Sequence, residues 1–313
     1  GNPKLAELLA VGAIRAGADA VKYQLVFADE LAVPDYAYYN LFKSLEMETA
    51  VWEHVVELIR LDHKKVYFDV YGDKSLDLAQ QLGASGVKIS TTDFYNTSLV
   101  KKAIASFKQV FISMGGIPIE EVDELIRNVK MESHVTFMYG FQAEPTQIED
   151  NNLLRIPEIK KRYPQMPIGF MDHTLGSADE ALYLPIMAMS LGATCIEKHI
   201  TLDPVLQIED YISALEPCRF GRFVQTIRTM EKALGRLDLI LTPKEKEYRN
   251  KAGKVVVAKR DLKIGEIVKE TDLALKRVKG GGTLDCFRRI SEVLGKQIAQ
   301  DVPINYPITK GVL

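Results

Sequence analysis

Short apolar runs alternate with amphipathic segments along the first 240 residues of the chain. Seven runs are rich in β-branched residues and have the length of strands; they lie at residues 20–25, 65–70, 86–91, 109–114, 134–141, 168–172 and 194–200. Segments with the apolar spacing of a helix lie between them, for example at 46–61, 76–82, 119–129 and 178–191. This alternation of strand and helix predicts a parallel sheet with crossover helices.

An eight-stranded (β/α)8 TIM barrel fits this α/β pattern better than an open doubly wound sheet. A dinucleotide-binding sheet would carry a Gly-x-Gly-x-x-Gly turn after a strand, and the sequence has no such turn. Polar residues end strands throughout the set, as they do around the mouth of a barrel. A helical segment at residues 3–16 precedes the first of the seven strands. The first strand of the barrel is therefore expected upstream of Gly1.

The residue pattern of the sequence changes near residue 240. Residues 241–252 include the charged stretch Lys244-Glu-Lys-Glu-Tyr-Arg, and short β-branched runs separated by glycine turns follow it. The change predicts a barrel domain over residues 1–240, a linker over 241–252 and a small, mostly β domain over 253–313.

The composition is that of an ordinary globular protein and excludes several function classes. Hydrophobic residues make up 47% and charged residues 26%, and the net charge is −2, so a basic surface for nucleic acid is not expected. No apolar run approaches the ~18 residues that a membrane helix needs. Cys195, Cys218 and Cys286 are isolated from one another, which indicates a reducing compartment, the cytoplasm.

Two of the five histidines stand at the ends of strand-like runs. His173 follows Ile-Gly-Phe-Met-Asp, and His199 follows Cys-Ile-Glu-Lys. The carboxyl ends of barrel strands converge on one mouth, and neutral imidazole is a common ligand of zinc, manganese or iron. Either histidine alone could simply cap its strand. Together, with Asp172, Glu197 and Lys198 beside them, they indicate a functional site.

Two lysines interrupt otherwise apolar strands, Lys22 and Lys88. A lysine that points into a barrel is costly unless an anion or a carboxylate pairs with it. A structural ion pair would account for one of them. Two such lysines, with hydroxyl groups at Ser90, Thr91 and Ser113, indicate an anion-binding pocket.

Motifs in the same order along nearly all 313 residues resemble those of the sialic acid synthase family. Lys22-Tyr-Gln is similar to the Lys-Phe-Gln of that family, Lys88-Ile to Lys-Ile-(Gly/Ala)-Ser, and Ser113-Met-Gly-Gly to Ser-Thr-Gly-Met. Gly169-Phe-Met-Asp-His-Thr resembles Gly-Tyr-Ser-Asp-His-Thr, and Glu197-Lys-His-Ile-Thr-Leu-Asp resembles Glu-Lys-His-Phe-Thr-Leu-Asp.

Three further stretches extend the resemblance. Pro145-Thr146 stands for the Pro-Thr of a longer family motif, and Asp210 followed by Leu215-Glu-Pro resembles Gly-Pro-Asp-His…Ser-Leu-Glu-Pro. The last segment resembles the antifreeze-like SAF domain of the family, in which Lys276-Arg277 precedes a glycine-rich turn. The resemblance thus implies a TIM barrel followed by a β-rich SAF domain, and a homodimer in which each SAF domain covers the partner's barrel.

The resemblance also implies a reaction, the condensation of phosphoenolpyruvate with an N-acetylmannosamine-type sugar aldehyde. The product would be a nine-carbon α-keto acid of the sialic, legionaminic or pseudaminic acid type, with release of phosphate. A divalent metal, manganese or else magnesium or cobalt, would be held by His173 and His199 and would polarise the aldehyde oxygen.

Residue roles follow from the same resemblance. The carboxylate and phosphate of phosphoenolpyruvate would be bound by Lys22, Lys88, Thr91 and Ser113. The acceptor sugar would be contacted by Gln24, Asp210 and, from the SAF domain, Arg277, and Gln142 takes the place of another substrate-binding residue. The residues expected to act in catalysis are Asp93, Lys88 and His199.

Five positions depart from the family pattern. Val70 stands where the family has a threonine near phosphoenolpyruvate, Met171 replaces a serine, Gln142 replaces serine or asparagine, and Glu144 replaces a tyrosine; Asp93 replaces the usual glutamate. Each lost hydrogen bond weakens binding by roughly 1–3 kcal/mol. Two alternatives therefore stay open: a non-catalytic sugar-binding protein, and another phosphoenolpyruvate-dependent aldolase-type barrel such as a keto-deoxyoctulosonate phosphate synthase. The SAF-like segment argues against the second alternative.

Overall fold

A parallel sheet of seven strands, which follow one another in chain order, forms the centre of the first of two units. The computed structural model describes residues 1–283 and 285–313, and the units are Gly1–Gly235 and Arg236–Leu313. All seven strands expected from the apolar runs are present. They are β1 (Ala20–Gln24), β2 (Lys65–Val70), β3 (Gly86–Ile89), β4 (Val110–Ser113), β5 (Val135–Gly140), β6 (Ile168–Asp172) and β7 (Cys195–Lys198).

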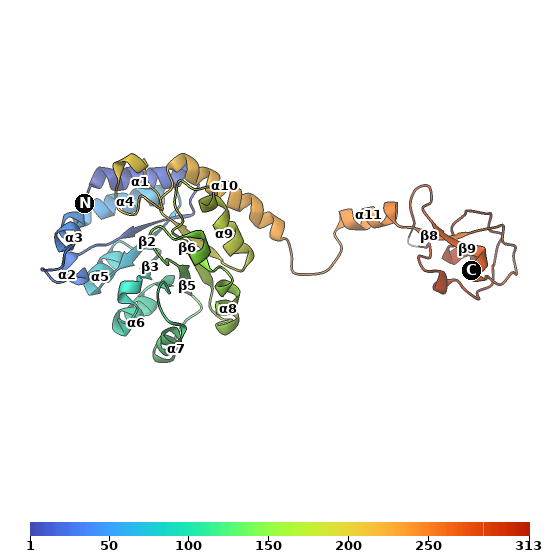
Figure 1. Ribbon diagram of the computed structural model, residues 1–313, viewed down its shortest axis with the longest axis horizontal. Helices are drawn as coiled ribbons and strands as arrows, with labels where there is room; N and C mark the ends of the chain where they lie inside the picture. Colours follow the sequence, from blue (N-terminus) through green and yellow to red (C-terminus); the bar gives the residue numbers. More distant parts are fainter. Residues whose placement is uncertain (284) are drawn as a thin grey trace. The chain divides into compact units, whose positions relative to one another are not determined.

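Helices surround the outer face of this curved sheet (Figure 1). They pack through apolar faces; α4, for example, buries Trp52, Val55 and Ile59, as expected for helices that cover one side of a parallel sheet. The helices of the unit are α1 (Pro3–Arg15), α2 (Ala28–Leu31), α3 (Tyr39–Leu45), α4 (Thr49–Leu61), α5 (Asp73–Gln81), α6 (Thr97–Ser106), α7 (Ile119–Asn128), α8 (Arg155–Arg162), α9 (Glu180–Ser190) and α10 (Pro217–Leu234).

The sheet curls so far that side chains from its two edge strands approach each other. Lys22 Nζ on β1 lies 3.8 Å from Glu197 Oε1 on β7. The inner strands β3, β5 and β6 are buried at every residue, whereas every residue of β7 is only half-buried. The fold is therefore an α/β fold with a curled parallel sheet, in which β1 and β7 are the edges.

The alternation of side chains along each strand decides which residues face the inside of the curl. On β2, Phe68 and Val70 are fully buried in the hydrophobic core. Asp69 points to the other face, and it lies in register with Gln24 on β1 and with Lys88 on β3. The three polar residues therefore form one row on the inner face, and Val70 is not part of that row.

The second unit begins with helix α11 (Pro243–Ala252), so the charged stretch that we expected to be a linker is helical. Thr242 caps this helix and accepts a hydrogen bond from the Glu245 backbone N–H at 3.2 Å. An antiparallel pair, β8 (Val255–Ala258) and β9 (Leu273–Lys276), follows it. The pair packs on a small apolar core that includes Val256, Leu262, Val268, Leu273, Val293, Ile298, Val302 and Ile308.

Among residues 1–283 and 285–313, no helix has both the length and the apolar character needed to cross a bilayer.

Candidate active site

Four charged side chains, one each from β1, β2, β3 and β7, meet on the inner face of the curled sheet. Lys22 Nζ lies 2.6 Å from Asp69 Oδ2 and Lys88 Nζ lies 2.5 Å from Glu197 Oε1. The approach of Lys22 to Glu197 at 3.8 Å links the two ion pairs. We call these four residues the charged cluster. Both lysines predicted to line an anion pocket are therefore present in it, but each has a carboxylate partner.

Lys22 and Glu197 stabilise each other's charged forms within this cluster. Burial alone would raise the pKa of Glu197, but the ammonium groups of Lys22 and Lys88 outweigh it and lower that pKa to about 2. Burial would lower the pKa of Lys22, but the carboxylates of Asp69 and Glu197 outweigh it and raise that pKa. Two cations and two anions leave the charged cluster with no net charge.

Hydroxyl groups form a second part of the inner surface, where β3 and β4 end. Thr91 Oγ1 and Ser113 Oγ lie 2.8 Å apart, and Thr91 Oγ1 also donates to the Gly115 carbonyl at 3.1 Å. A Cβ atom at Gly115 would lie 3.0 Å from the carbonyl oxygens of Gly140 and Phe141. This position therefore favours glycine, which lets the backbone after Ser113 pass close to the end of β5. Thr91 and Ser113 were both predicted, and they are in contact.

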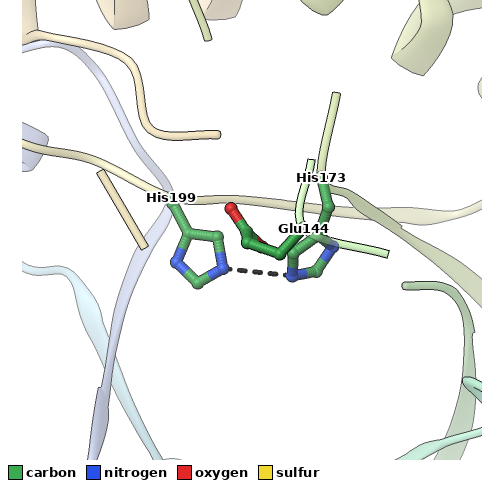
Figure 2. A group of neighbouring side chains, drawn as sticks. All are labelled: Glu144, His173 and His199. Carbon is green, nitrogen blue, oxygen red and sulfur yellow. Dashed lines mark hydrogen bonds between the residues drawn. The ribbon is translucent and has the colours of Figure 1, made fainter. Parts of the chain in front are cut away.

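The two histidines lie side by side, with a carboxylate next to them (Figure 2). His173 Nε2 and His199 Nε2 are 3.1 Å apart. One side-chain oxygen of Glu144 and one ring nitrogen of each histidine all lie within 4.8 Å of one another. The sequence identified both histidines as a pair, but it identified Glu144 only as a departure from a family tyrosine. We call these three residues the His–His–Glu cluster.

Burial keeps both imidazoles neutral. It lowers the pKa of His173 to about 4, and burial together with the His173 ring lowers the pKa of His199 well below its usual value. His173 Nδ1 faces the Met171 carbonyl at 3.4 Å. In this contact Nδ1 donates, so Nε2 is the unprotonated nitrogen of the ring, and its lone pair faces His199 Nε2 at 3.1 Å. Two neutral imidazole nitrogens and one carboxylate oxygen are a donor set that suits a divalent first-row metal. The residues present therefore fit a metal.

Two of the three residues predicted to contact an acceptor sugar lie near His199 or on β1. Asp210 Oδ2 is 3.8 Å from His199 Nδ1, and burial and the neighbouring Glu209 raise the pKa of Asp210. Gln24 Oε1 accepts a hydrogen bond from the Tyr71 hydroxyl at 3.0 Å. This contact leaves the amide nitrogen of Gln24 as a donor for a ligand.

Three further predicted residues lie away from the charged cluster or outside this unit. Asp93 is in a short 3₁₀ turn after β3, where it accepts from the Thr92 hydroxyl at 2.8 Å and where burial raises its pKa. Gln142 lines a separate cavity of about 860 Å³ between the β4–α7 turn and α8. Arg277 belongs to the second unit, where its Nε donates to the Ala252 carbonyl at 2.9 Å.

Two residues in or beside the site were missed. Asp69 could have been recognised by the argument used for the lysines, because it too is a charged residue on an apolar strand. Arg155 lines the cavity that contains Gln142, but it lies in a charged helix and the sequence offers no signal for it. Met171, one of the departures, is in register with Glu197 and is 2% exposed. Unlike Val70, it does occupy the inner face.

Comparison with known proteins gives a consistent result. The family model described as the NeuB family matches residues 10–238, and the model of the SAF domain matches residues 253–311. An uncharacterized protein of Methanocaldococcus jannaschii is 30% identical over 306 residues, which cover 96% of this chain and 87% of that protein.

One relative and one solved structure carry functional names. The N,N′-diacetyllegionaminic acid synthase of Legionella pneumophila is 26% identical over 325 residues, covering 96% of this chain and 88% of that protein. The crystal structure of the N-acetylneuraminic acid (sialic acid) synthetase of Leptospira borgpetersenii matches with a TM-score of 0.73 and 26% identity, covering 80% of this chain and 87% of that one.

Proposed function

This chain belongs to the NeuB family, and we propose from this that it is an enzyme that condenses phosphoenolpyruvate with an N-acetylmannosamine-type amino sugar. The reaction joins C3 of phosphoenolpyruvate to the aldehyde carbon, consumes one water and releases phosphate. The product is a nine-carbon α-keto acid of the sialic, legionaminic or pseudaminic acid type. The match over residues 10–238 carries this proposal, and relatives named as synthases of such acids support it.

The inner-face cations and hydroxyls are proposed to bind phosphoenolpyruvate. Lys22 and Lys88 would pair with its acidic groups, and the contacting hydroxyls of Thr91 and Ser113 would donate hydrogen bonds to them. Because each lysine already has a carboxylate partner, binding of the substrate requires these pairs to rearrange. Gln142 would contact the substrate from the edge of the neighbouring cavity.

The His–His–Glu cluster is proposed to hold a divalent metal, with His173 and His199 as the nitrogen ligands and Glu144 as a third donor. We propose manganese, with magnesium or cobalt as alternatives. A metal bound there would polarise the aldehyde oxygen of the acceptor. The neutral state of both imidazoles supports the assignment, since a protonated ring cannot be a ligand.

The remaining predicted residues receive roles on the acceptor side. Gln24 and Asp210 are proposed to orient the hydroxyl groups of the sugar, and Arg277 to reach it from the SAF domain of a partner chain. Asp93 is proposed as a catalytic acid, which its raised pKa supports because a carboxyl that holds its proton longer can donate it. Lys88 and His199 are the other two proposed catalytic residues. Lys88 would bind phosphoenolpyruvate, and His199 would hold the metal beside the sugar aldehyde.

The architecture around this site is also a proposal. We propose that an eighth strand pairs with β1 and β7 and closes the sheet into a TIM barrel. The meeting of Lys22 and Glu197 and the half-exposure of β7 support this closure. The proposed domains are a synthase barrel over residues 1–240, a connection over 241–252 and a SAF domain over 253–313, in a homodimer located in the cytoplasm.

A specific observation supports one second function, sugar binding without turnover. Asp69 neutralises Lys22, and Met171 places a thioether where a hydroxyl would donate to phosphate. Both features weaken the binding of a multiply charged substrate while they leave the acceptor residues in place.

Phosphate release separates the two functions. The protein is incubated with phosphoenolpyruvate, Mn²⁺ and a panel of 2-acetamido sugars, free and phosphorylated, with reactions lacking the sugar or the metal as controls. Sugar- and metal-dependent release establishes the synthase and identifies its acceptor. Sugar binding detected by calorimetry without any release contradicts the synthase and establishes the binding function.

A further inference from the structure

The residues immediately before the two histidines form a buried ion pair. Asp172 Oδ2 and Lys198 Nζ are 2.9 Å apart, and both side chains are 0% exposed. The two residues are in-register neighbours on β6 and β7. Asp172 immediately precedes His173 in the sequence, and Lys198 immediately precedes His199. Each histidine is therefore preceded, on its own strand, by one member of the ion pair.

The pair lies on the opposite side of the sheet from the charged cluster. Met171 and Glu197 are also in register, and Glu197 faces inward to Lys88. Because successive side chains on a strand point to opposite faces, Asp172 and Lys198 point outward, toward the layer of helices. A substrate on the inner face cannot contact them, so they do not act as substrate ligands.

Burial of this ion pair is not explained by stability alone. Two charges removed from water lose solvation that their mutual attraction rarely repays, and apolar residues of similar size are often at least as stabilising. A role in positioning accounts for the retained charges.

Hydrogen bonds connect the pair to the backbone around His173. Asp172 Oδ1 accepts from the Thr174 backbone N–H at 2.9 Å, and Lys198 Nζ donates to the Thr174 carbonyl at 3.1 Å. The pair therefore holds both the backbone N–H and the backbone carbonyl of Thr174, the residue after His173. Since one of the two partners is on β7, the end of β6 is fixed relative to the strand that carries His199.

The segment that carries Glu144 is attached at the same point. The Thr146 backbone N–H donates to the His173 carbonyl at 2.9 Å, and Thr146 forms a parallel bridge with Thr174. Thr146 Oγ1 donates to the Ala143 carbonyl at 2.7 Å and so closes the turn around Glu144. All three members of the His–His–Glu cluster thus depend on backbone that the ion pair holds.

We propose that Asp172 and Lys198 are positioning residues that fix His173 and His199 in the geometry required for a divalent metal. The inference rests on the metal site of the proposed function. Groups that orient metal ligands without touching the metal typically contribute 10–100-fold to metal affinity. An ion pair that bridges both ligand-bearing strands, and whose two members are each hydrogen-bonded to the backbone of Thr174, acts in this way.

The test is a variant in which apolar residues of similar size replace both charges, Asp172→Leu with Lys198→Met. Loss of both charges avoids an unpaired buried ion, so the fold is expected to survive. We expect the Kd for Mn²⁺, measured from the electron paramagnetic resonance signal of the free ion, to rise about 10–100-fold. The melting temperature of the metal-free protein should change by less than about 5 °C.

A control variant removes an ion pair that belongs to neither the charged cluster nor the His–His–Glu cluster. Asp123 and Arg162 pair on the outer surface between α7 and α8, and Asp123→Asn with Arg162→Met should leave the Kd for Mn²⁺ unchanged. Lys198→Arg is the second test variant, in case the double variant does not fold. It keeps the charge but cannot reproduce the geometry of the ammonium, and a several-fold weaker affinity is expected.

The outcomes separate this inference from the proposed function. Wild-type affinity for Mn²⁺ in the double variant, or in Lys198→Arg when the double variant does not fold, overturns the positioning role while the metal site stands. Absence of Mn²⁺ binding by the wild-type chain overturns the metal site itself, and the positioning role with it. A Kd that rises equally in the Asp123 control also contradicts the inference, because the effect would then not be specific to this pair.

Discussion

The Lys22 ammonium on β1 lies 2.6 Å from a carboxylate oxygen of Asp69 on the neighbouring strand. Asp69 is 4% exposed, and its other carboxylate oxygen accepts no hydrogen bond from any residue that the structure describes. The carboxylate therefore takes one of the three N–H groups of the Lys22 ammonium. An anionic ligand of Lys22 would compete with Asp69 for this ammonium and would meet a second negative charge beside it.

Asp69→Asn should strengthen the binding of phosphoenolpyruvate. Two unit charges a few ångströms apart interact by up to about 4 kcal/mol at an effective dielectric of about 20, so removal of the Asp69 charge should lower the KM for phosphoenolpyruvate at least about 10-fold. Initial rates of phosphate release at saturating sugar measure this constant. A higher KM would instead mean that Asp69 is needed to orient Lys22, and would contradict the competition.

Lys88→Ala should have two separable effects. Loss of this cation weakens phosphoenolpyruvate, so its KM should rise at least 10-fold, while the KM for the sugar changes little. Glu197 also loses its 2.5 Å partner and keeps only Lys22 at 3.8 Å, and loss of this close partner from a buried carboxylate should lower the free energy of unfolding by about 3 kcal/mol. Urea unfolding measures the second effect, and the double variant Lys88→Ala with Glu197→Gln should recover part of it. An unchanged KM for phosphoenolpyruvate would exclude Lys88 from its binding site.

The positions of the strands and of the two histidines could be predicted from the sequence, because both depend on local patterns. The apolar run that ends in Asp172-His173 has the length of a buried strand, and the structure has β6 there. Residues at the ends of parallel strands share one edge of the sheet, so the proximity of His173 and His199 follows from topology alone. In the structure the Nε2 atoms of the two histidines lie 3.1 Å apart.

Other features depend on contacts between distant segments, and no local pattern encodes these contacts. Val70 was expected to remove a hydrogen bond from the substrate site. Its position on β2 instead directs its side chain into the hydrophobic core, and the neighbouring Asp69 faces the inside of the sheet. Glu144 is 29 and 55 residues from the two histidines, and it joins them because the following residues bridge to the end of β6. The pairing of each acidic residue with a particular lysine likewise depends on the curl of the sheet.

Glu144→Gln should weaken metal binding without loss of the fold. The amide keeps the shape of the side chain but removes the charge and makes it a poorer ligand than a carboxylate, so the Kd for Mn²⁺ should rise about 10-fold. His199→Ala removes a nitrogen ligand and should abolish metal-dependent turnover. Calorimetric titration with Mn²⁺ measures both variants, and circular dichroism checks the fold. Full metal affinity in His199→Ala would refute the assignment of the cluster.

Acid should destabilise the metal-free protein through His173. The pKa of this residue is about 4 in the folded chain, where burial disfavours the charged ring, and 6.5 is its ordinary value. Between these values the unfolded chain binds a proton that the folded chain does not, so stability is full above pH 6.5 and falls as the pH drops toward 4. Over the whole window the loss from this group is about 3 kcal/mol, since one pKa unit corresponds to ~1.4 kcal/mol.

Urea unfolding of the metal-free protein at pH 7.5, 6, 5 and 4.5 measures this loss, and His173→Asn is the matched variant because it removes the titrating ring. The difference in stability between pH 7.5 and 4.5 should be smaller in the variant by about 2–3 kcal/mol. Glu197 does not confuse the result, because its pKa of about 2 lies below an ordinary value of 4.5, so its stabilisation is lost only as the pH falls below about 4.5. An identical pH dependence in both proteins would show that burial does not keep His173 neutral. The argument that its neutral ring is ready to bind a metal would then be contradicted.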